Sequence, residues 1–425
     1  MPVPKGMRDF PPEVAIIRRD VLSRLSNVFE RFGFEPLETP ILELWSTLKG
    51  KYGPDAENKM IYKFKDEWGG KELAMRYDLT VPLARFMSET QRALPFKRYA
   101  IGQVYRHENP QKGRYREFYQ CDIDVVGSKE PIADAEVINV IGAVMDEFRL
   151  PGYVVKLNDR RLLRGIFERG LGIDRNILEV YRIIDKRDKI GWVGIRKELK
   201  KLLPLDKVKK IKDIIDMRGE PDEVLDEVEQ MFPRINEIKD ASSQIREILA
   251  LTKKVKIELD LSMVRGLDYY TGPIFETIVK EPRIGSITGG GRYDELLGRY
   301  GKDLPATGTT IGIERLIDAG MELGIFKKAG TVADVYVVDL GDRDYAWRVA
   351  KCLRDDGINT RVDLMGRKWK KQITEAEKLS VRFVVIVGPQ EAKKGEVILI
   401  DKEKETKRVE KILKARKTIK TLLIS

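Results

Sequence analysis

The character of the sequence changes sharply at two points, and these changes limit the folds that the chain can adopt. A helical pattern follows Pro11–Pro12 and ends at Gly33, and from there to about residue 171 short strand-like runs are separated by glycine, proline and charge. From Gly172 to Leu251 the apolar spacing becomes helical, and residues 185–213 carry eleven lysines and arginines against five acids. Strand-like runs then return in IELDLSMV, PIFETIVK and GSITGG. We therefore expect a helical insertion within one strand-rich domain.

A second domain boundary is predicted near Gly324–Gly330. Beyond it the β-branched runs VADVYVVDL, INTRVDL and VRFVVIV alternate with helical spacing, in which Ala346, Val349, Ala350 and Leu353 share one face. Alternating strands and helices predict a separate α/β domain of about a hundred residues. The predicted domains are a strand-rich domain of residues 1–171 and 252–324, a helical insertion of residues 172–251, and a C-terminal α/β domain of residues 330–425.

Composition narrows the possible partners and compartments. The 425 residues carry a net charge of +11, which indicates either a polyanionic partner such as nucleic acid or a lysine-rich solvated surface. One histidine and two distant cysteines, Cys121 and Cys352, exclude a Cys/His zinc site and a disulfide framework. The longest apolar run, near Val384–Val387, is too short to span a bilayer, and MPVPKGMRDF lacks the apolar core of a signal peptide. We expect a cytoplasmic protein with no membrane partner.

Two strand-like runs flank one densely charged turn. RYAIGQVY and EFYQCDIDVV predict an antiparallel hairpin with its loop at residues 109–113, which contain Asn-Pro and Lys-Gly. Strand alternation puts Gln120, Asp122 and Asp124 on one face of the second run. This polar face is predicted either to form the floor of a site or simply to be solvated.

The segment AMRYDLTVP has the same character when it is treated as a strand. Arg76, Asp78 and Thr80 then share one face, opposite Tyr77 and Leu79. The two polar strand faces are predicted to meet at one place, unless each is an ordinary solvated face.

The hairpin itself, YRHENPQKGRYREFYQ, is rich in arginine and tyrosine. A guanidinium group binds phosphate oxygens bidentately, and arginine and tyrosine side chains stack on a base. Both a nucleotide site and a hairpin that binds nucleic-acid backbone agree with this composition. His107, the only histidine, has no nucleophile motif near it, so we expect a structural role rather than Ser–His–Asp or Cys–His catalysis.

Glycine-rich segments follow the predicted insertion. VRGLDYYTGPIFE spans residues 264–276, and the glycines of TGGGRYDELLG, residues 288–298, allow a ligand to approach the backbone. The triplet matches neither GxGxxG nor GxxxxGK[ST], which excludes the Rossmann and P-loop interpretations. TTIGIERLID predicts a strand, Gly312 and a helix with Arg315 in its first turn. That arrangement suits an anion, although a single arginine is also compatible with a solvated surface.

These segments together resemble the motifs of the class II aminoacyl-tRNA synthetases, and within that class the histidyl-tRNA synthetase family. RFGFEPLETPIL, which contains Pro40, resembles motif 1, YRHENPQKGRYREFYQ resembles motif 2, and GIERL resembles motif 3. VRGLDYYTG and GGGRYDEL resemble two signatures of the histidyl family. The resemblance extends from about residue 5 to the end of the chain.

The resemblance implies a fold, an assembly and a reaction. The fold is an α+β class II catalytic domain, with an antiparallel sheet flanked by helices, a helical insertion that contacts tRNA, and a C-terminal α/β anticodon-binding domain. The assembly is a homodimer formed through motif 1. The reaction activates L-histidine with ATP to histidyl-adenylate and then transfers histidine to the 3′-terminal adenosine of tRNA(His). Mg²⁺ is expected to accompany ATP, with no metal ligand assigned to the protein.

The resemblance also assigns residues to ATP and to catalysis. Arg106 and Arg265 would contact the α-phosphate, with Arg265 on the side where other class II enzymes hold a metal ion. Glu108 would contact the adenine, and Arg114 and Arg315 would bind the β- and γ-phosphates. A preorganised cation at the α-phosphate is what the charge developing in phosphoryl transfer requires.

A second set of residues is assigned to histidine. Asp78, Thr80 and Gln120 would bind its ammonium group, and Asp124 and Tyr270 would bind the two imidazole nitrogens. Tyr269 and Tyr293 complete the predicted histidine-binding set. Asp78 and Asp124 stand where bacterial members of the family carry glutamate. A pocket that hydrogen-bonds its substrate rejects analogues by roughly 10⁴–10⁵ without proofreading, so the basic insertion is assigned to RNA rather than to editing.

Two other interpretations compete with this one. A regulatory subunit of ATP phosphoribosyltransferase shares the catalytic fold, but such subunits usually lack the anticodon domain and the phosphate-binding arginines. An RNA-binding adaptor explains the basic charge but not the paired signatures.

Overall fold

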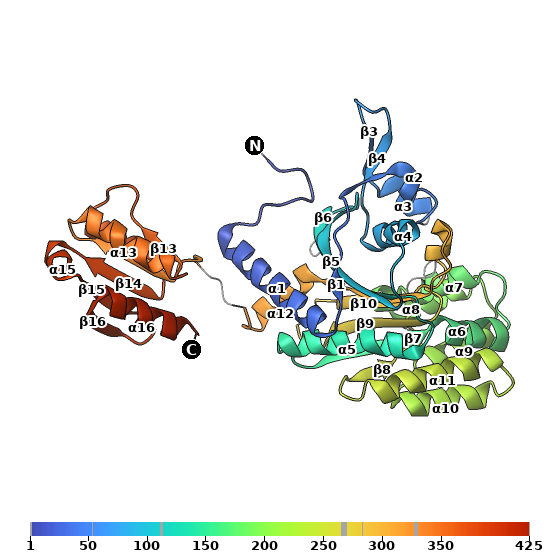
Figure 1. The fold of residues 1–425 in the computed structure, drawn as a ribbon. Coiled ribbons are helices and arrows are strands. Elements are labelled where there is room, and N and C mark those ends of the chain that lie inside the picture. The colour runs from blue at the N-terminus through green and yellow to red at the C-terminus, as the bar shows by residue number, and fades with distance from the viewer. Residues whose placement is uncertain are drawn as a thin grey trace. The chain divides into compact units, whose positions relative to one another are not determined.

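The structure is a computed structural model that describes residues 2–52, 54–110, 114–264, 270–282, 284–326 and 330–424 (Figure 1). The chain forms two compact units. The larger consists of Met1–Asp9 and Val21–Phe326, and the smaller of Phe10–Asp20 and Lys327–Ser425. Helix α1 (Pro12–Arg31) contributes to both.

An eight-stranded sheet forms the centre of the larger unit, in the order β1-β5-β6-β11-β10-β9-β7-β8. Its strands are β1 (Glu35–Pro36), β5 (Phe96–Tyr105), β6 (Glu117–Val126), β7 (Tyr153–Asp159), β8 (Ile257–Leu259), β9 (Pro273–Val279), β10 (Ser286–Arg292) and β11 (Ala306–Gly312). The pairing is antiparallel from β5 to β7, and only the end strands β1 and β8 are parallel to their neighbours. The expected antiparallel sheet is confirmed, and strands from both sides of residues 172–251 contribute to it.

Helix α5 (Pro131–Glu147) fixes one side of this sheet. Arg292 of β10 donates to the Asp134 carboxylate of α5 at 2.7 Å, and both side chains are buried. Asn139 of α5 donates to the carbonyl of Leu251 at 3.1 Å, which joins α5 to the next layer of helices. Figure 1 shows α5 beneath the sheet with α11 beyond it. The other helical elements of this part of the chain are α4 (Thr80–Glu89), α6 (Arg160–Arg164), η1 (Gly165–Gly170), η2 (Leu297–Tyr300) and α12 (Ile313–Glu322).

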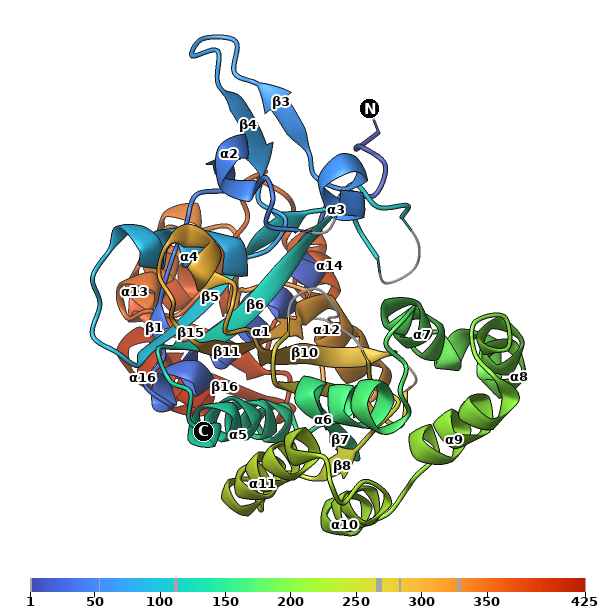
Figure 2. The ribbon, with the colours of Figure 1, turned by 90° about the vertical axis from the view of Figure 1, so that its right-hand side faces the viewer.

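The segment from residue 172 to residue 251 is helical, as its apolar spacing predicts. Its helices are α7 (Ile177–Ile184), α8 (Arg187–Leu199), α9 (Leu205–Ile215), α10 (Pro221–Met231) and α11 (Asn236–Leu251). Each of α7, α9, α10 and α11 buries one apolar stripe, which in α11 consists of Ile238, Ala241, Ile245 and Ile248. Figure 2 shows α7, α8 and α9 in an arc beside the sheet.

A small three-stranded sheet lies before the hairpin in the chain, in the order β2-β4-β3. Its strands are β2 (Leu42–Leu44), β3 (Lys63–Lys65) and β4 (Glu72–Met75), accompanied by the short helices α2 (Trp45–Leu48) and α3 (Pro54–Lys59). One face packs on a core of Trp45, Leu48, Ile61, Ala74 and Val81. The β3–β4 hairpin projects away from the rest of the unit (Figure 2).

The strand predicted for AMRYDLTVP is wrong beyond Met75. Strand β4 ends at Met75 and helix α4 begins at Thr80, so Arg76, Asp78 and Thr80 do not share a strand face. The Asp78 carboxylate accepts a hydrogen bond from the Val81 N–H at 3.0 Å and so satisfies a free donor of the first helical turn. Pro82, which has no backbone N–H and therefore needs no acceptor, is tolerated in that turn.

The strand predicted for IELDLSMV is also shorter than expected. Strand β8 stops at Leu259, and the Asp260 carboxylate accepts hydrogen bonds from both the N–H and the hydroxyl of Ser262 at 3.0 and 2.5 Å. This local Asx turn competes with continuation of the strand.

The smaller unit contains the predicted α/β domain. Its sheet has the order β13-β12-β14-β15-β16, in which β13, β12 and β14 are parallel and β14, β15 and β16 are antiparallel. Its strands are β12 (Val335–Asp339), β13 (Thr360–Val362), β14 (Phe383–Val387), β15 (Glu396–Asp401) and β16 (Thr406–Lys411), and its helices are α13 (Arg343–Asp355), α14 (Trp369–Lys378), α15 (Pro389–Lys394) and α16 (Ile412–Ile424).

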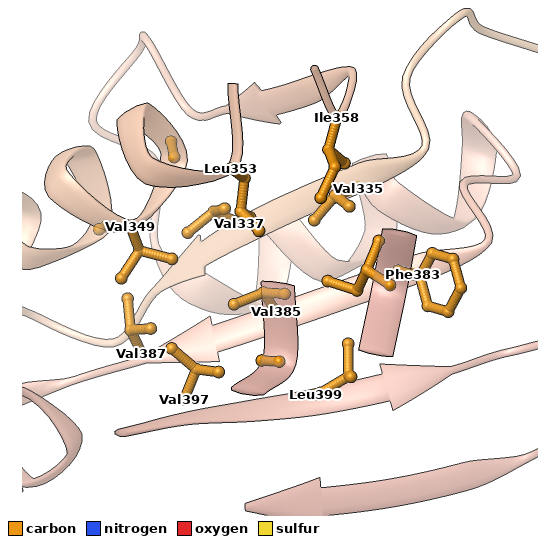
Figure 3. Packing of buried hydrophobic residues seen from close by; sticks show 14 of the residues in the cluster. Val335, Val337, Val349, Leu353, Ile358, Phe383, Val385, Val387, Val397 and Leu399 are labelled. Atoms are coloured by element: carbon orange, nitrogen blue, oxygen red, sulfur yellow. The ribbon is translucent and has the colours of Figure 1, made fainter. Parts of the chain in front are cut away.

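Both faces of this sheet are covered. Figure 3 shows Val349 and Leu353 of α13 packed on Val337 and Val385 on one face, in the cluster that also includes residues of α16. Ala376 of α14 packs on the opposite face. The three-layer arrangement matches the strand–helix alternation of the sequence. In the described parts of the chain, no helix combines the length and apolar character that crossing a membrane requires.

Candidate active site

A cavity of about 470 Å³ opens where β6, β11, β10 and β9 of the large sheet meet the hairpin and α12. Its wall combines residues from distant parts of the sequence. Six of the predicted site residues line it, namely Arg106, Glu108, Arg114, Gln120, Tyr270 and Arg315. The cavity is therefore the meeting point of the three segments that resemble motif 2, motif 3 and the first histidyl signature.

The cavity opens on one face of adjacent strands, where it is lined by Gln120, Thr310, Gly312, Gly289 and Glu276. In β6, Gln120, Asp122 and Asp124 lie opposite Gly312, Thr310 and Gly308 of β11. A Cβ atom at Gly308 would overlap the Asp124 carboxylate, so only glycine allows this close approach. Gly289 of β10, which lies opposite Thr310, has open space where a Cβ atom would lie. The glycine triplet thus lies within a strand, and only Gly289 leaves room beside the backbone, whereas a Cβ atom at Gly290 or Gly291 would overlap neighbouring atoms.

The arginines occupy the end of the cavity nearest the hairpin loop. Arg106 donates from Nε to the Tyr77 carbonyl at 3.1 Å, and its guanidinium lies 4.4 Å from the centroid of the Tyr77 ring. Arg315 donates to the Ser286 carbonyl at 2.5 Å, and Arg114 lies 3.9 Å from the Glu108 carboxylate. Three cations at one end of a cavity suit a polyanion.

A buried ion pair lies further along β6, outside the cavity wall. Arg98 of β5 is directly opposite Asp124 in the β5–β6 register, and its Nη2 lies 2.7 Å from Asp124 Oδ2. Arg98 is fully buried and Asp124 is 3% exposed. The hydroxyl of Tyr293 donates a short hydrogen bond to the other oxygen, Oδ1, of Asp124. Burial raises the pKa of Asp124, and the Arg98 charge and the Tyr293 hydrogen bond oppose the rise.

Asp122 comes between Gln120 and Asp124 on the same face of β6 and, unlike Gln120, does not line the cavity. Burial raises its pKa to about 7; the Arg98 charge and a hydrogen bond with Thr310 oppose the rise, while the charges of Asp124 and Asp78 add to it. The Gln120 amide donates to the Thr310 hydroxyl at 3.3 Å, so Gln120, Thr310 and Asp122 form one chain of hydrogen bonds. Thr310 and Gln120 line the cavity.

Asp78 belongs to the same electrostatic cluster from a different element. Its carboxylate accepts from the Tyr52 hydroxyl at 3.1 Å and from the first turn of α4, and burial raises its pKa despite these bonds. The Asp78 charge acts on both Asp122 and Tyr270. Burial raises the Tyr270 pKa first, and the charges of Asp122, Asp124, Glu276 and Asp78 raise it further, so Tyr270 keeps its proton and can donate.

The other predicted site residues do not line the cavity or lie outside the described residues. Asp78, Thr80, Asp124 and Tyr293 do not contribute to the cavity wall, although Asp78 and Asp124 interact electrostatically with Tyr270, which does. Arg265 and Tyr269 lie outside the described residues.

Other cavity residues were not singled out from the sequence. Glu276, Thr310 and Glu314 line the cavity, and Arg98 compensates Asp124 beneath it. Arg98 carried a usable signal, because an arginine in the apolar run RYAIGQVY needs a buried partner. Glu276 carried the same signal within PIFETIVK.

Metal ligation by the protein was not expected. The described residues contain no group of three or more histidine, cysteine, aspartate or glutamate side chains arranged to hold a metal ion. Glu108, Glu276 and Glu314 each line the cavity as single carboxylates.

Comparison with known proteins adds to this geometry. A family profile described as "Histidyl-tRNA synthetase" matches residues 6–316, and one described as "Anticodon binding domain" matches residues 334–422. The chain is 50% identical to a histidine–tRNA ligase of Aeropyrum pernix over 99% of this chain and 98% of the relative. It is 48% identical to a histidine–tRNA ligase of Korarchaeum cryptofilum over 94% of each chain. A crystal structure of histidyl-tRNA synthetase from Nostoc sp. PCC 7120 has a TM-score of 0.87, with 30% identity and 99% coverage of both chains.

Proposed function

The chain belongs to the histidyl-tRNA synthetase family, and we propose that the cavity on its large sheet is where its reaction takes place. The activity is that of a histidine–tRNA ligase, which activates histidine with ATP to histidyl-adenylate and charges tRNA(His). The finer steps proposed are in-line attack of the histidine carboxylate on the α-phosphate, release of pyrophosphate, and transfer of histidine to the 3′-terminal adenosine.

Arg106 is proposed to hold the α-phosphate, and Arg114 and Arg315 to hold the β- and γ-phosphates. In phosphoryl transfer the protein contributes mainly position and charge, because charge spreads over the phosphoryl oxygens in the transition state. A cation already fixed in place stabilises that charge without reorganisation. The stacking of Arg106 on Tyr77 supports such preorganisation. Arg265, outside the described residues, is proposed as the second α-phosphate cation.

The amino acid is proposed to bind between the arginines and the buried carboxylates. Gln120, with Asp78 and Thr80, would bind the ammonium group, and Asp124 and Tyr270 would bind the two imidazole nitrogens. Tyr269 and Tyr293 complete the proposed histidine-binding set. Glu108 is proposed to contact the adenine. The carboxylate-rich end repels phosphate and the arginine-rich end repels ammonium, so charge alone orients the two substrates.

Mg²⁺ is proposed to enter with ATP rather than to reside in the protein. Magnesium in such sites keeps several waters and needs only one or two carboxylates besides the substrate phosphates. Glu314, which lines the same cavity as Arg106 and Arg315, fits that requirement. When bound, the ion would neutralise phosphate charge.

One observation carries the assignment: Arg106 and Arg315, far apart in the sequence, line one cavity with Gln120 and Tyr270. The test is ATP–pyrophosphate exchange with each amino acid in turn, and exchange is expected with histidine alone. Arg106→Ala should slow histidine activation by about 10²–10³, the scale of a lost oxyanion donor. The exposed Arg175 provides the matched control, Arg175→Ala, with exchange unchanged. Unimpaired single-turnover activation by Arg106→Ala contradicts the assigned role.

A homodimer is proposed from the exposed face of the small sheet. Leu42 and Leu44 of β2 are 45% and 42% exposed, and Phe64 of β3 is 47% exposed. Phe64 and Leu44 both lie opposite Leu73 of the central strand β4. The side chains of Leu44, Leu73 and Phe64 therefore form one apolar row across the sheet. An apolar sheet face of this kind needs a partner, and the adjacent segment resembles motif 1. A second copy of the chain is the proposed partner.

The domain boundaries proposed are a catalytic domain of residues 1–171 and 252–324, a helical insertion of residues 172–251, and an anticodon-binding domain of residues 330–425. Exposed Leu364, Met365 and Trp369 near Arg367 and Lys368 give the last domain apolar and cationic side chains that suit an RNA loop. Deleting residues 175–248 should weaken tRNA charging and spare histidine activation; loss of both steps in a folded variant contradicts the division.

A cytoplasmic location is proposed because the tRNA substrate is used there.

A further inference from the structure

The N-terminal segment of the chain lies directly against the hairpin that connects β5 and β6. The backbone N–H of Arg116 donates to the Gly6 carbonyl at 2.8 Å, and its side chain donates from Nε to the Glu108 carbonyl at 3.0 Å. Gly6 has a φ of +85°, and a Cβ atom there would lie 2.8 Å from the Cγ atoms of both Arg116 and Pro110. Only glycine allows this approach, so the segment is fixed closely on the hairpin.

Arg8, which follows in the same segment, contacts two parts of the cavity wall. Its guanidinium carbon lies 3.6 Å from the centroid of the Tyr115 ring, and its Nη2 lies 3.8 Å from Glu314 Oε1. Tyr115 belongs to the hairpin and Glu314 to the first turn of α12, and both line the cavity. The Arg8 side chain is 34% exposed and does not itself line the cavity. Arg8 therefore links the hairpin to α12 from outside the cavity.

The two residues that Arg8 contacts are the chain neighbours of two arginines proposed to bind ATP. Arg114 precedes Tyr115, and Arg315 follows Glu314. Arg114 and Arg315 are proposed to hold the same end of the triphosphate from two different elements. They bind it together only when the hairpin and α12 are correctly spaced, because a substrate clamp depends on the positions of its groups.

We propose that Arg8 is a positioning residue for ATP, which fixes the hairpin against the start of α12 and so sets the spacing of the phosphate-binding arginines. This inference rests on the proposed function of the cavity. Arg8 acts through Tyr115 and Glu314, without contact to the phosphates. Its loss lowers the fraction of molecules in which the two elements are correctly spaced, and the apparent affinity for ATP falls by that fraction. Histidine, which is proposed to bind on the sheet, is affected little.

The test is ATP–pyrophosphate exchange, with separate measurement of the KM for ATP and the KM for histidine. Arg8→Met removes the charge and keeps a long unbranched side chain. The KM for ATP should rise by about 5- to 30-fold, the combined scale of one cation–π contact and one partly exposed ion pair, while the KM for histidine stays within about twofold. A purely structural role raises both constants together, or lowers kcat and leaves both constants unchanged. Either result overturns the proposal.

A double-variant cycle distinguishes positioning from direct binding of phosphate by Arg8. Tyr115→Ala removes the ring on which Arg8 stacks. If Arg8 acts through Tyr115, the KM for ATP of the double variant should equal that of the more impaired single variant. Effects that multiply in the double variant show that Arg8 binds ATP independently, and they overturn the proposal.

The matched control is Arg354→Met in the C-terminal domain. The Arg354 guanidinium lies 5.5 Å from the centroid of the Trp347 ring, so the same substitution removes an arginine from an aromatic ring away from the cavity, and the KM for ATP should equal that of the parent. If Arg8→Met does not fold, Gly6→Ala displaces the same segment and should also raise the KM for ATP selectively. Absence of histidine-dependent exchange in the parent protein refutes the cavity's function itself. Normal exchange with an unchanged KM for ATP in the variants refutes only the role of Arg8.

Discussion

Asp122 should make the protein less stable as the pH rises, and Asp122→Asn should remove that loss. The pKa of Asp122 rises from 3.8 to about 7 on folding. A raised carboxyl pKa means that the folded state favours the protonated form. Stability from this group is fully present below the unfolded pKa and is lost as the pH rises through the folded pKa. About three pKa units correspond to about 4 kcal/mol in total, of which about 3 kcal/mol is lost between pH 5 and pH 8.

The assay is urea unfolding of the parent and of Asp122→Asn at unit steps from pH 5 to pH 8, followed by circular dichroism. Asparagine does not titrate, so the free energy of unfolding of the variant should rise by about 3 kcal/mol relative to that of the parent between pH 5 and pH 8. Burial also raises the pKa values of Asp78 and Asp124, and these two residues titrate with Asp122 as one cluster. They will therefore contribute part of the pH dependence of the free energy of unfolding.

A control acid should show no such trend. Burial opposes ionisation of Asp260, but Lys156 and Ser262 hold its pKa below the ordinary value. Its contribution is therefore present above the unfolded pKa and is lost only as the pH falls through the folded pKa, below pH 4. The difference in free energy of unfolding between Asp260→Asn and the parent should be constant from pH 5 to pH 8. For Asp122→Asn the same difference should rise with pH, and a constant or falling difference would refute the reasoning.

Three further results are expected. Arg98→Met should lower the free energy of unfolding by about 3–5 kcal/mol in urea, because it leaves Asp124 charged and buried without its cation; a cost below about 1 kcal/mol contradicts the pairing. Gly308→Ala should raise the KM for histidine without changing the KM for ATP, since the new methyl group displaces the Asp124 carboxylate; equal changes in both constants argue against it. Leu44→Asp should shift the protein from dimer to monomer in sedimentation velocity, and an unchanged sedimentation coefficient rules out that sheet face as the interface.

The hairpin and the smaller unit were predictable because their signals are local. RYAIGQVY and EFYQCDIDVV alternate with period two on either side of a turn, and the structure contains the strands Phe96–Tyr105 and Glu117–Val126 at those positions. The small unit follows from apolar runs separated by helical spacing. In both cases neighbouring residues determine the element, so no distant contact is needed to choose it.

The segment around Asp78 was not predictable from alternation because its structure depends on one capping bond. Arg76, Asp78 and Thr80 have strand periodicity, yet the Val81 N–H is satisfied by the Asp78 carboxylate and a helix begins. Arg76 instead donates to the carbonyls of Gln103 and Thr39 at 2.7 and 2.8 Å. A side chain that bonds to its own backbone competes with the sheet, and periodicity does not register that competition.

The Arg98–Asp124 pair required the strand register. Each residue was visible in the sequence, but their pairing depends on how far β5 and β6 are shifted along each other. A shift of one residue would move Arg98 to the other face and leave Asp124 unpaired. The observed register joins them directly. Site residues on one strand are thus predictable as a set, whereas the partner of each one is fixed only by tertiary pairing.

The same register explains why the cavity separates its substrates by charge. The hairpin carries Arg106 and Arg114 beyond the ends of β5 and β6, and the sheet carries the buried acids further along β6, with Gln120 between them. A single strand therefore runs from the end that attracts phosphate to the end that accepts hydrogen bonds. At the acid end, one buried oxygen each of Asp122 and Asp124 has no hydrogen-bond partner among the described residues, and the Asp124 oxygen lies 2.7 Å from the Arg98 guanidinium. A buried carboxylate whose charge is only partly compensated lowers stability at neutral pH, and groups with pKa values perturbed in this way cluster at functional sites.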